Sequence, residues 1–237
     1  MNTLHITGFE DWAVLTSTGP IPNPSRLLVD RIRGDGNLQR ELAKCAGVGD
    51  VQTALLPVPN GHDLLVIQHI TKSALSQLYA KVNPEDVMLS LGQGSLMQRG
   101  PVLEGFFTNT LQNQGIDSIA FDTQQPKDTV IKARGDLEAL TSQMRESYPE
   151  ISYGTNAGRY VCNMVGYLND QCLGAHSLFV HLPGLPNDAT LVENFWKVNR
   201  TILRGSGLTS PKNLAHPSVE ENVAFVRTLL TIWKSFR

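Results

Sequence analysis

The residue with the clearest chemical potential is Cys162, at the edge of a predicted amphipathic helix over residues 156–169. The apolar positions of this helix recur at helical spacing, at Val161, Met164, Val165 and Leu168. A thiol with an ordinary pKa of about 8.5 is only slightly ionised at neutral pH, and a helix N-terminus or an adjacent imidazolium lowers that pKa. Cys162 is therefore the candidate nucleophile. Cys45 and Cys172 fit the commoner description of a helical cysteine as a small buried hydrophobic residue.

A histidine partner for this thiol is His181, inside the apolar strand predicted after the helix. A helix, a turn and a strand in succession bring the strand beside the helix, so the two side chains can meet. A cysteine–histidine pair also needs a third group that fixes the imidazole tautomer. Glu104 is the lone carboxylate in the apolar loop of residues 100–107. Alternatively, His181 is a satisfied core residue and Glu104 an exposed loop charge.

The elements that must position these residues alternate along the chain. Strands are predicted over residues 4–7, 51–58, 86–91, 118–121 and 177–182. Helices are predicted from residue 23 through Ile32 and over residues 64–81, 136–147, 156–169, 190–204 and 218–235. This alternation predicts an α/β fold, a single three-layer α/β/α domain with a largely parallel, mixed central sheet of the phosphorylase/hydrolase-like type. The least patterned stretches, 10–22, 92–117 and 122–135, lie beyond strand ends, where open α/β sheets place their ligands.

Composition excludes several function classes. The 237 residues carry 20 basic and 22 acidic side chains, a net charge of −2, which gives no strong field towards nucleic acid or an anionic membrane. No run of 18 apolar residues and no secretory signal occurs, so we expect a cytoplasmic protein without a membrane segment. Phosphate-loop, dinucleotide, zinc-protease and serine-hydrolase motifs are also missing, which leaves a phosphate-binding protein as a distant alternative.

Four stretches together resemble the pyroglutamyl peptidase I family, the cysteine peptidases that remove an N-terminal pyroglutamate. They are residues 7–12 followed by Asn23-Pro24-Ser25, residues 91–93 followed by Leu103-Glu104 and Asn109, residues 156–163, and residues 179–183. They span residues 4 to 183 in the family's order. The stretch around Cys162, Asn-Ala-Gly-Arg-Tyr-Val-Cys-Asn, is the most specific of them.

The resemblance implies a catalytic triad. Cys162 would be the nucleophile, His181 the general base and then the acid, and Glu104 the group that orients His181. The whole chain, residues 1–237, would be one catalytic domain acting through a thioester, with no metal and no cofactor. Its substrates would be peptides with an N-terminal pyroglutamate, and it would form a homo-oligomer, a dimer or a tetramer.

The resemblance also implies a pocket for the lactam ring, lined by Phe9 and Trp12 with Gln93 close to it. The family has Pro-Phe-Gly-Gly where this chain has Asp11-Trp12-Ala13-Val14, which changes the pocket. A cysteine amidase with altered N-terminal specificity is therefore one alternative. The alternative from another class is a non-catalytic descendant that binds blocked N-termini or a protein partner.

Overall fold

A mixed six-stranded sheet forms the centre of the computed structural model, with the strand order β11-β6-β12-β5-β1-β4. In chain order these strands are β1 (Thr3–Phe9), β4 (Asp50–Leu56), β5 (Val87–Gln93), β6 (Val102–Glu104), β11 (Ser152–Gly154) and β12 (Ser177–Leu182). All neighbouring pairs are parallel except β12 and β6, which run antiparallel. The structure describes residues 2–11, 15–16, 19–20, 22–59, 63–95, 98–112, 117–184, 189–205, 209–214 and 216–237.

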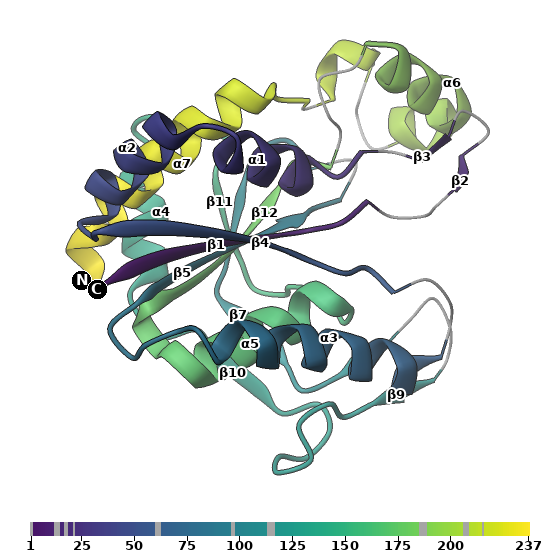
Figure 1. Cartoon of the computed structure of the whole chain (residues 1–237). Helices are drawn as coiled ribbons and strands as arrows, with labels where there is room; N and C mark the ends of the chain where they lie inside the picture. Colours follow the sequence, from purple (N-terminus) through teal and green to yellow (C-terminus); the bar gives the residue numbers. More distant parts are fainter. Residues whose placement is uncertain are drawn as a thin grey trace.

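Helices cover both faces of this sheet and make three layers (Figure 1). The helices are α1 (Pro24–Arg33), α2 (Gly36–Ala46), α3 (Leu64–Tyr79), α4 (Leu137–Met144), α5 (Val161–Leu173), α6 (Ala189–Gly205) and α7 (Val219–Trp233). One face carries α1, α2, α4 and α7, and the other carries α3 and α5. Because both faces are covered, the central strands β5 and β12 are buried almost throughout, as parallel strands usually are. The predicted fold class is confirmed.

Three further strand pairs lie outside the central sheet. They are β2 (Leu15–Thr16) with β3 (Gly19–Pro20), β7 (Phe106–Thr108) with β10 (Val130–Lys132), and β8 (Leu111–Gln112) with β9 (Ser118–Ile119). The strand predicted over residues 118–121 is therefore wrong as a central strand, because only its first two residues pair, and they pair with β8. Its expected place in the sheet is taken by β6 and β11, three-residue strands too short to show an alternating pattern.

The helix that carries Cys162 begins later than predicted, at Val161 rather than at residue 156. Gly158 has a φ of 79°, which a helix does not accept, and its N–H bonds the Asn156 side chain at 3.0 Å. Residues 156–160 therefore form a turn, and Cys162 falls in the first turn of α5 instead of the second. The other predicted helices are confirmed within a few residues, while α2 was not predicted.

The parallel strands end at one edge of the sheet, on the right of Figure 1, and this carboxyl edge is where the site lies. Phe9, Leu56, Gln93 and Leu182 are the last residues of β1, β4, β5 and β12. Since β6 runs the other way next to β12, it begins at this same edge. No helix in the described ranges is long and apolar enough to cross a membrane.

Helix α5 packs unusually close to β7, because Gly166 faces the Phe107 ring. A Cβ on Gly166 would lie 2.1 Å from Phe107 Cε1, and Phe107 is buried. We expect Gly166→Ala to lower the free energy of unfolding by about 1–3 kcal/mol through overpacking, more than the better helix propensity of alanine restores. Urea denaturation would measure it.

Gly205→Ala is the matched control, since no atom of the described residues lies within 4 Å of its added Cβ at the end of α6. Its effect should stay within about 0.5 kcal/mol. Equal changes in the two variants would contradict the close packing of α5 on β7.

Candidate active site

His181 and Glu104 meet because β12 and β6 are antiparallel neighbours. His181 is paired in register with Val102, and Glu104 lies two residues beyond Val102, on the same face of the sheet. The imidazole Nδ1 lies 2.7 Å from Glu104 Oε1, within hydrogen-bond distance. Both residues are buried, at 8% and 4% exposure, so this is a carboxylate–imidazole pair shielded from water.

A glycine on a neighbouring strand makes room for each partner. Gly92 is paired with His181, and a Cβ there would meet the imidazole Cδ2 at 2.8 Å. Gly154 is paired with Glu104, and a Cβ there would lie 2.2 Å from Glu104 Oε2. Phe179 closes the pair from the side, with its ring 5.1 Å from the imidazole and nearly perpendicular to it. The two side chains are therefore held in one arrangement by the backbone of both neighbours.

Cys162 approaches the imidazole from α5, which packs on β12, β5 and β7. The thiol is half-buried, and it lies close enough to His181 to contribute to the raised pKa of the imidazole. Tyr160, the residue before the helix, provides no side-chain cap, so its side chain leaves the N–H groups of the first turn available. Those donors and the helix dipole form a setting suited to an anion, including an oxyanion formed beside Cys162.

The ionisation of His181 is set by its two partners. Burial alone lowers the pKa of His181, but the hydrogen bonds and charges of Cys162 and Glu104 outweigh it and raise the pKa to about 10. The imidazolium is thus favoured well above its ordinary range. A thiolate–imidazolium pair is the form of a cysteine–histidine dyad that attacks carbonyl carbon.

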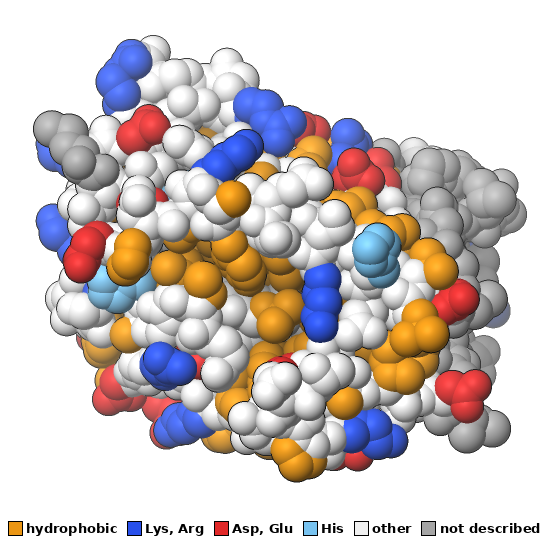
Figure 2. All heavy atoms as spheres, turned by 60° about the horizontal axis from the view of Figure 1, so that its bottom comes forward, with side chains coloured by type: hydrophobic (Ala, Val, Ile, Leu, Met, Phe, Trp, Pro, Cys, Tyr) orange, Lys and Arg blue, Asp and Glu red, His pale blue; other side chains and the backbone are white. Residues whose placement is uncertain are grey.

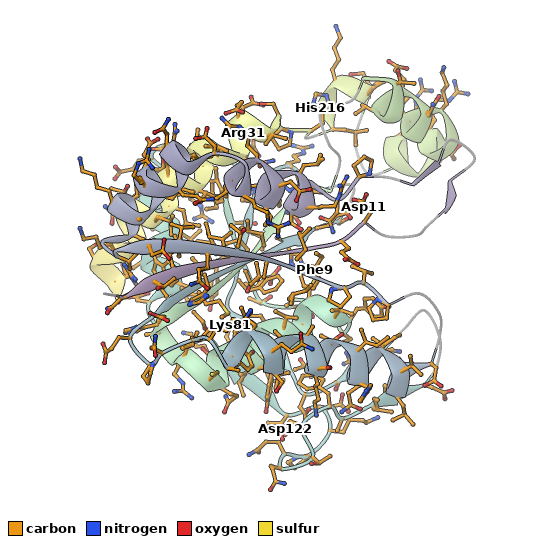
Figure 3. The ribbon with its side chains drawn as sticks, viewed as in Figure 1. Phe9, Asp11, Arg31, Lys81, Asp122 and His216 are labelled. Carbon is orange, nitrogen blue, oxygen red and sulfur yellow. The ribbon has the colours of Figure 1, made fainter. Side chains whose placement is uncertain are left out.

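Gln93 and Phe9 lie at the same edge of the sheet. Gln93 Nε2 donates to Gly184 O at 2.8 Å, whereas Gln93 Oε1 is buried and accepts no hydrogen bond from any described residue. Phe9 is only 2% exposed and packs against Phe179, so it supports the histidine strand from inside the core (Figure 3). Trp12 lies outside the described residues.

Asp11, which departs from the family pattern, has a structural use. Its Oδ1 accepts from Asn23 N and from Arg26 Nε, both at 2.8 Å, and so ties the end of β1 to the start of α1. Figure 3 shows Asp11 beside this helix. No cluster of metal-ligating side chains occurs among the residues that the structure describes.

Sequence reasoning missed Gly154 and Phe179 as parts of the site, and it missed the contact of Gly92 with the imidazole. Gly154 and Glu104 become neighbours only through the pairing of β11 with β6, which no local pattern announces. Gly92 and Phe179 were visible as a glycine at a strand end and an aromatic two residues before His181. Their contact with the imidazole depends on the register of β5 with β12.

Solved structures of pyrrolidone carboxyl peptidases share this fold. The enzyme from Fervidobacterium islandicum AW-1 superposes with a TM-score of 0.68, at 20% identity over 100% of both chains. The enzyme from Thermus thermophilus gives 0.65 at 21% identity over 96% of this chain and 98% of its own. Pyroglutamyl peptidase I from Bacillus amyloliquefaciens gives 0.65 at 13% identity over 100% and 96%. The resemblance expected from the four sequence stretches is confirmed at the level of the fold.

Neither a protein-family model nor a curated protein matches the sequence. The likeness is therefore carried by three-dimensional structure, across the whole length of the chain.

The geometry predicts that Cys162 is the fastest-reacting thiol of the chain. With limiting iodoacetamide at pH 7 we expect it to be alkylated at least about tenfold faster than Cys172, because a thiolate stabilised by an imidazolium is the reactive form. Cys172, at the other end of α5, is the internal comparison: it is more exposed, but burial raises its pKa. Peptide mapping by mass spectrometry would give both rates.

His181→Ala should slow Cys162 to about the rate of Cys172. Equal labelling of the two cysteines in the parent protein would argue that Cys162 is not activated.

Proposed function

We propose that the chain is a cysteine exopeptidase that hydrolyses the peptide bond after an N-terminal pyroglutamyl residue. The observation that carries this proposal is the convergence of Glu104, His181 and Cys162 from three separate elements: Glu104 Oε1 lies 2.7 Å from His181 Nδ1, and Cys162 lies close enough to the imidazole to raise its pKa. The fold shared with pyrrolidone carboxyl peptidases supports the same reaction. Residues 1–237 would then form one catalytic domain.

The first half of the reaction forms the thioester. Glu104 accepts a hydrogen bond from Nδ1 of His181, which leaves Nε2 to take the thiol proton of Cys162. The thiolate attacks the carbonyl carbon of the pyroglutamyl residue, and the electron pair moves to the carbonyl oxygen, held by N–H groups of the first turn of α5. When the tetrahedral intermediate collapses, the C–N bond breaks and His181 gives its proton to the leaving amine.

The second half hydrolyses this thioester. His181, now neutral, removes a proton from a water molecule, whose oxygen attacks the thioester carbonyl. The C–S bond breaks, free pyroglutamate leaves, and the proton returns to Cys162. Each proton is carried by the chain's own side chains, so the reaction as proposed uses no metal and no cofactor.

Substrate selection would depend on groups suited to a flat, uncharged lactam. Gln93 Oε1, buried without a partner in the described part of the chain, is an acceptor for the lactam N–H. An unfilled acceptor of this kind discriminates strongly, because a ring without the N–H leaves it unpaired. Trp12 and Phe9 remain our proposed apolar side of the pocket, with Phe9 acting from the core.

The proposed homo-oligomer, a dimer or a tetramer, has a suitable surface. Figure 2 shows hydrophobic side chains gathered in a hollow on the face that carries α3 and α5, with charged side chains around it. Large exposed hydrophobic residues of the described chain include Leu65, Val66 and Val130, at 67%, 48% and 58% exposure. Apolar surface of this kind is typical of an interface between subunits.

The alternatives differ in what they leave unexplained. A cysteine amidase with another N-terminal specificity would use the same three residues and a different pocket, so the departure at Asp11-Trp12 is the observation that favours it. A non-catalytic binding protein has no need for a buried carboxylate–imidazole pair. Burying such a pair costs desolvation, and here the pair also contacts the thiol.

A substrate panel separates these functions. Under reducing conditions we expect release of the amine from a pyroglutamyl amide, and a fall in kcat of at least about 10³-fold in Cys162→Ala. Amides blocked by prolyl, acetyl and a cyclopentane-carbonyl group, which lacks the lactam N–H, complete the panel. Cleavage of a different amide would identify the amidase, and no cleavage of any by folded protein would refute the enzyme.

The pKa of His181 makes a further prediction about pH. Because that pKa is raised to about 10, the imidazolium persists through neutral pH, and kcat/KM should fall only as pH rises towards 10. In Glu104→Gln one of the charges that raises this pKa is gone, so the alkaline fall moves to lower pH. At pH 7 kcat/KM should drop by about 10²-fold.

Circular dichroism at each pH is the control for unfolding. An alkaline limb at the same pH in Glu104→Gln and the parent protein would show that Glu104 does not act on His181.

A further inference from the structure

Asn163, the residue after the candidate nucleophile, makes a three-point contact with the strand segment opposite it. Its Oδ1 accepts from Thr108 N at 2.8 Å, and its Nδ2 donates to Thr108 O at 2.7 Å and to Thr110 O at 3.0 Å. Asn163 is 0% exposed. A side-chain amide has the acceptor and the two donors that this segment needs, and no charge.

The segment that Asn163 holds leads directly to the acid of the triad. Thr108 ends β7, and β7 begins two residues after Glu104, the last residue of β6. Glu104 in turn bonds His181 at 2.7 Å. Asn163 therefore links the thiol to the carboxylate. Cys162 is its direct neighbour in the sequence, and Thr108, which it binds, lies four residues after Glu104.

Neighbouring contacts make this connection stiff. Gln112 N donates to Arg159 O at 2.6 Å, just before α5, and Thr110 Oγ1 donates to Asp128 Oδ1 at 2.6 Å. Asp128 has a φ of 66°, a strained value for a residue with a side chain, and is held there by these contacts. The segment opposite α5 is thus held by hydrogen bonds around Thr108. Because Asn163 binds this segment and is adjacent to Cys162, the position of the segment determines where Cys162 lies.

We propose that Asn163 is a positioning residue that sets the sulfur of Cys162 against the imidazole of His181. The inference rests on the proposed function only in taking Cys162 as the nucleophile. Without the Asn163 amide, the first turn of α5 would lose its three hydrogen bonds to the segment opposite, and the thiol would lose its fixed place beside the ring. A misplacement of about 1 Å at a reacting atom lowers a rate about 10²-fold.

Asn169, in the same helix, is the matched control. If Asn163 only stabilised the fold, replacing either asparagine would have the same effect on the thiol. Asn169 is also buried and hydrogen-bonded on both sides of its amide, to Tyr79 OH at 2.6 Å and to Ser90 Oγ at 2.8 Å. It lies far from the first turn of α5. Its loss should cost stability as the loss of Asn163 does, with no effect on the thiol.

The experiment measures the alkylation rate of Cys162 by iodoacetamide against pH in the parent protein, Asn163→Ala and Asn169→Ala, with thermal unfolding of each. We expect Asn163→Ala to react about 10- to 100-fold more slowly than the parent protein at pH 7. Asn169→Ala should react within about threefold of the parent while it loses comparable stability.

If Asn163→Ala does not fold, Asn163→Asp gives the readout, because it keeps the acceptor for Thr108 N–H but not the two donors. Parent-like alkylation in the folded Asn163 variant, or an equal slowing in Asn169→Ala, would overturn the proposal. Hydrolysis of a pyroglutamyl amide is measured separately. A parent protein that cleaves no amide while its alkylation still depends on Asn163 would refute the proposed function and leave the positioning role standing.

Discussion

The 2.7 Å contact between Glu104 and His181 is the interaction on which the rest of the site depends. A carboxylate buried in an apolar setting is costly unless a charged or hydrogen-bonding partner compensates it. Here the imidazole is that partner, and the carboxylate makes the imidazolium favourable in return. In the proposed mechanism this imidazolium lies beside the sulfur of Cys162, in the first turn of α5. The Glu104 carboxylate and the His181 imidazolium therefore stabilise each other, and the Cys162 thiol lies beside the same imidazole.

The central sheet brings Glu104 to His181 because one pair of neighbouring strands, β12 and β6, is antiparallel. Parallel strands bring their carboxyl ends to one edge, which places His181 and Gln93 there, but β6 enters the sheet antiparallel to β12. That reversal sets Val102 opposite His181 and Glu104 diagonally across from it. Side chains as large as these fit on adjacent strands only because Gly92 and Gly154 stand beside them. The mixed sheet is thus a requirement of the site, since a parallel β6 would have a different register with His181.

The sequence allowed the candidate catalytic residues to be named but not their contacts. Cys162 at the edge of an apolar stripe, His181 in an apolar strand and Glu104 alone in its loop are each marked by local pattern. The strands β6 and β11 are three residues long and have no period to detect, so the pairings that bring Glu104 to His181 and Gly154 to Glu104 could not be derived. The start of α5 was predicted too early because the sequence does not show the positive φ of Gly158. That backbone conformation excludes a helix at residue 158, although the helical spacing of apolar residues suggested one.

A second histidine–carboxylate pair shows why such a contact alone is not a site. His5 Nε2 lies 3.1 Å from Asp86 Oδ2, and both residues are as buried as the pair at the carboxyl edge. Asp86 also accepts from Thr3 N and Asn83 N, and these hydrogen bonds lower its pKa although burial opposes them. This carboxylate is saturated by backbone donors and ties together the starts of β1 and β5. Glu104 instead keeps one oxygen without a partner among the described residues and gives the other to a ring that also meets a thiol. The reactivity that we propose therefore depends on what the second nitrogen of the imidazole faces, and that is decided by the placement of the first turn of α5.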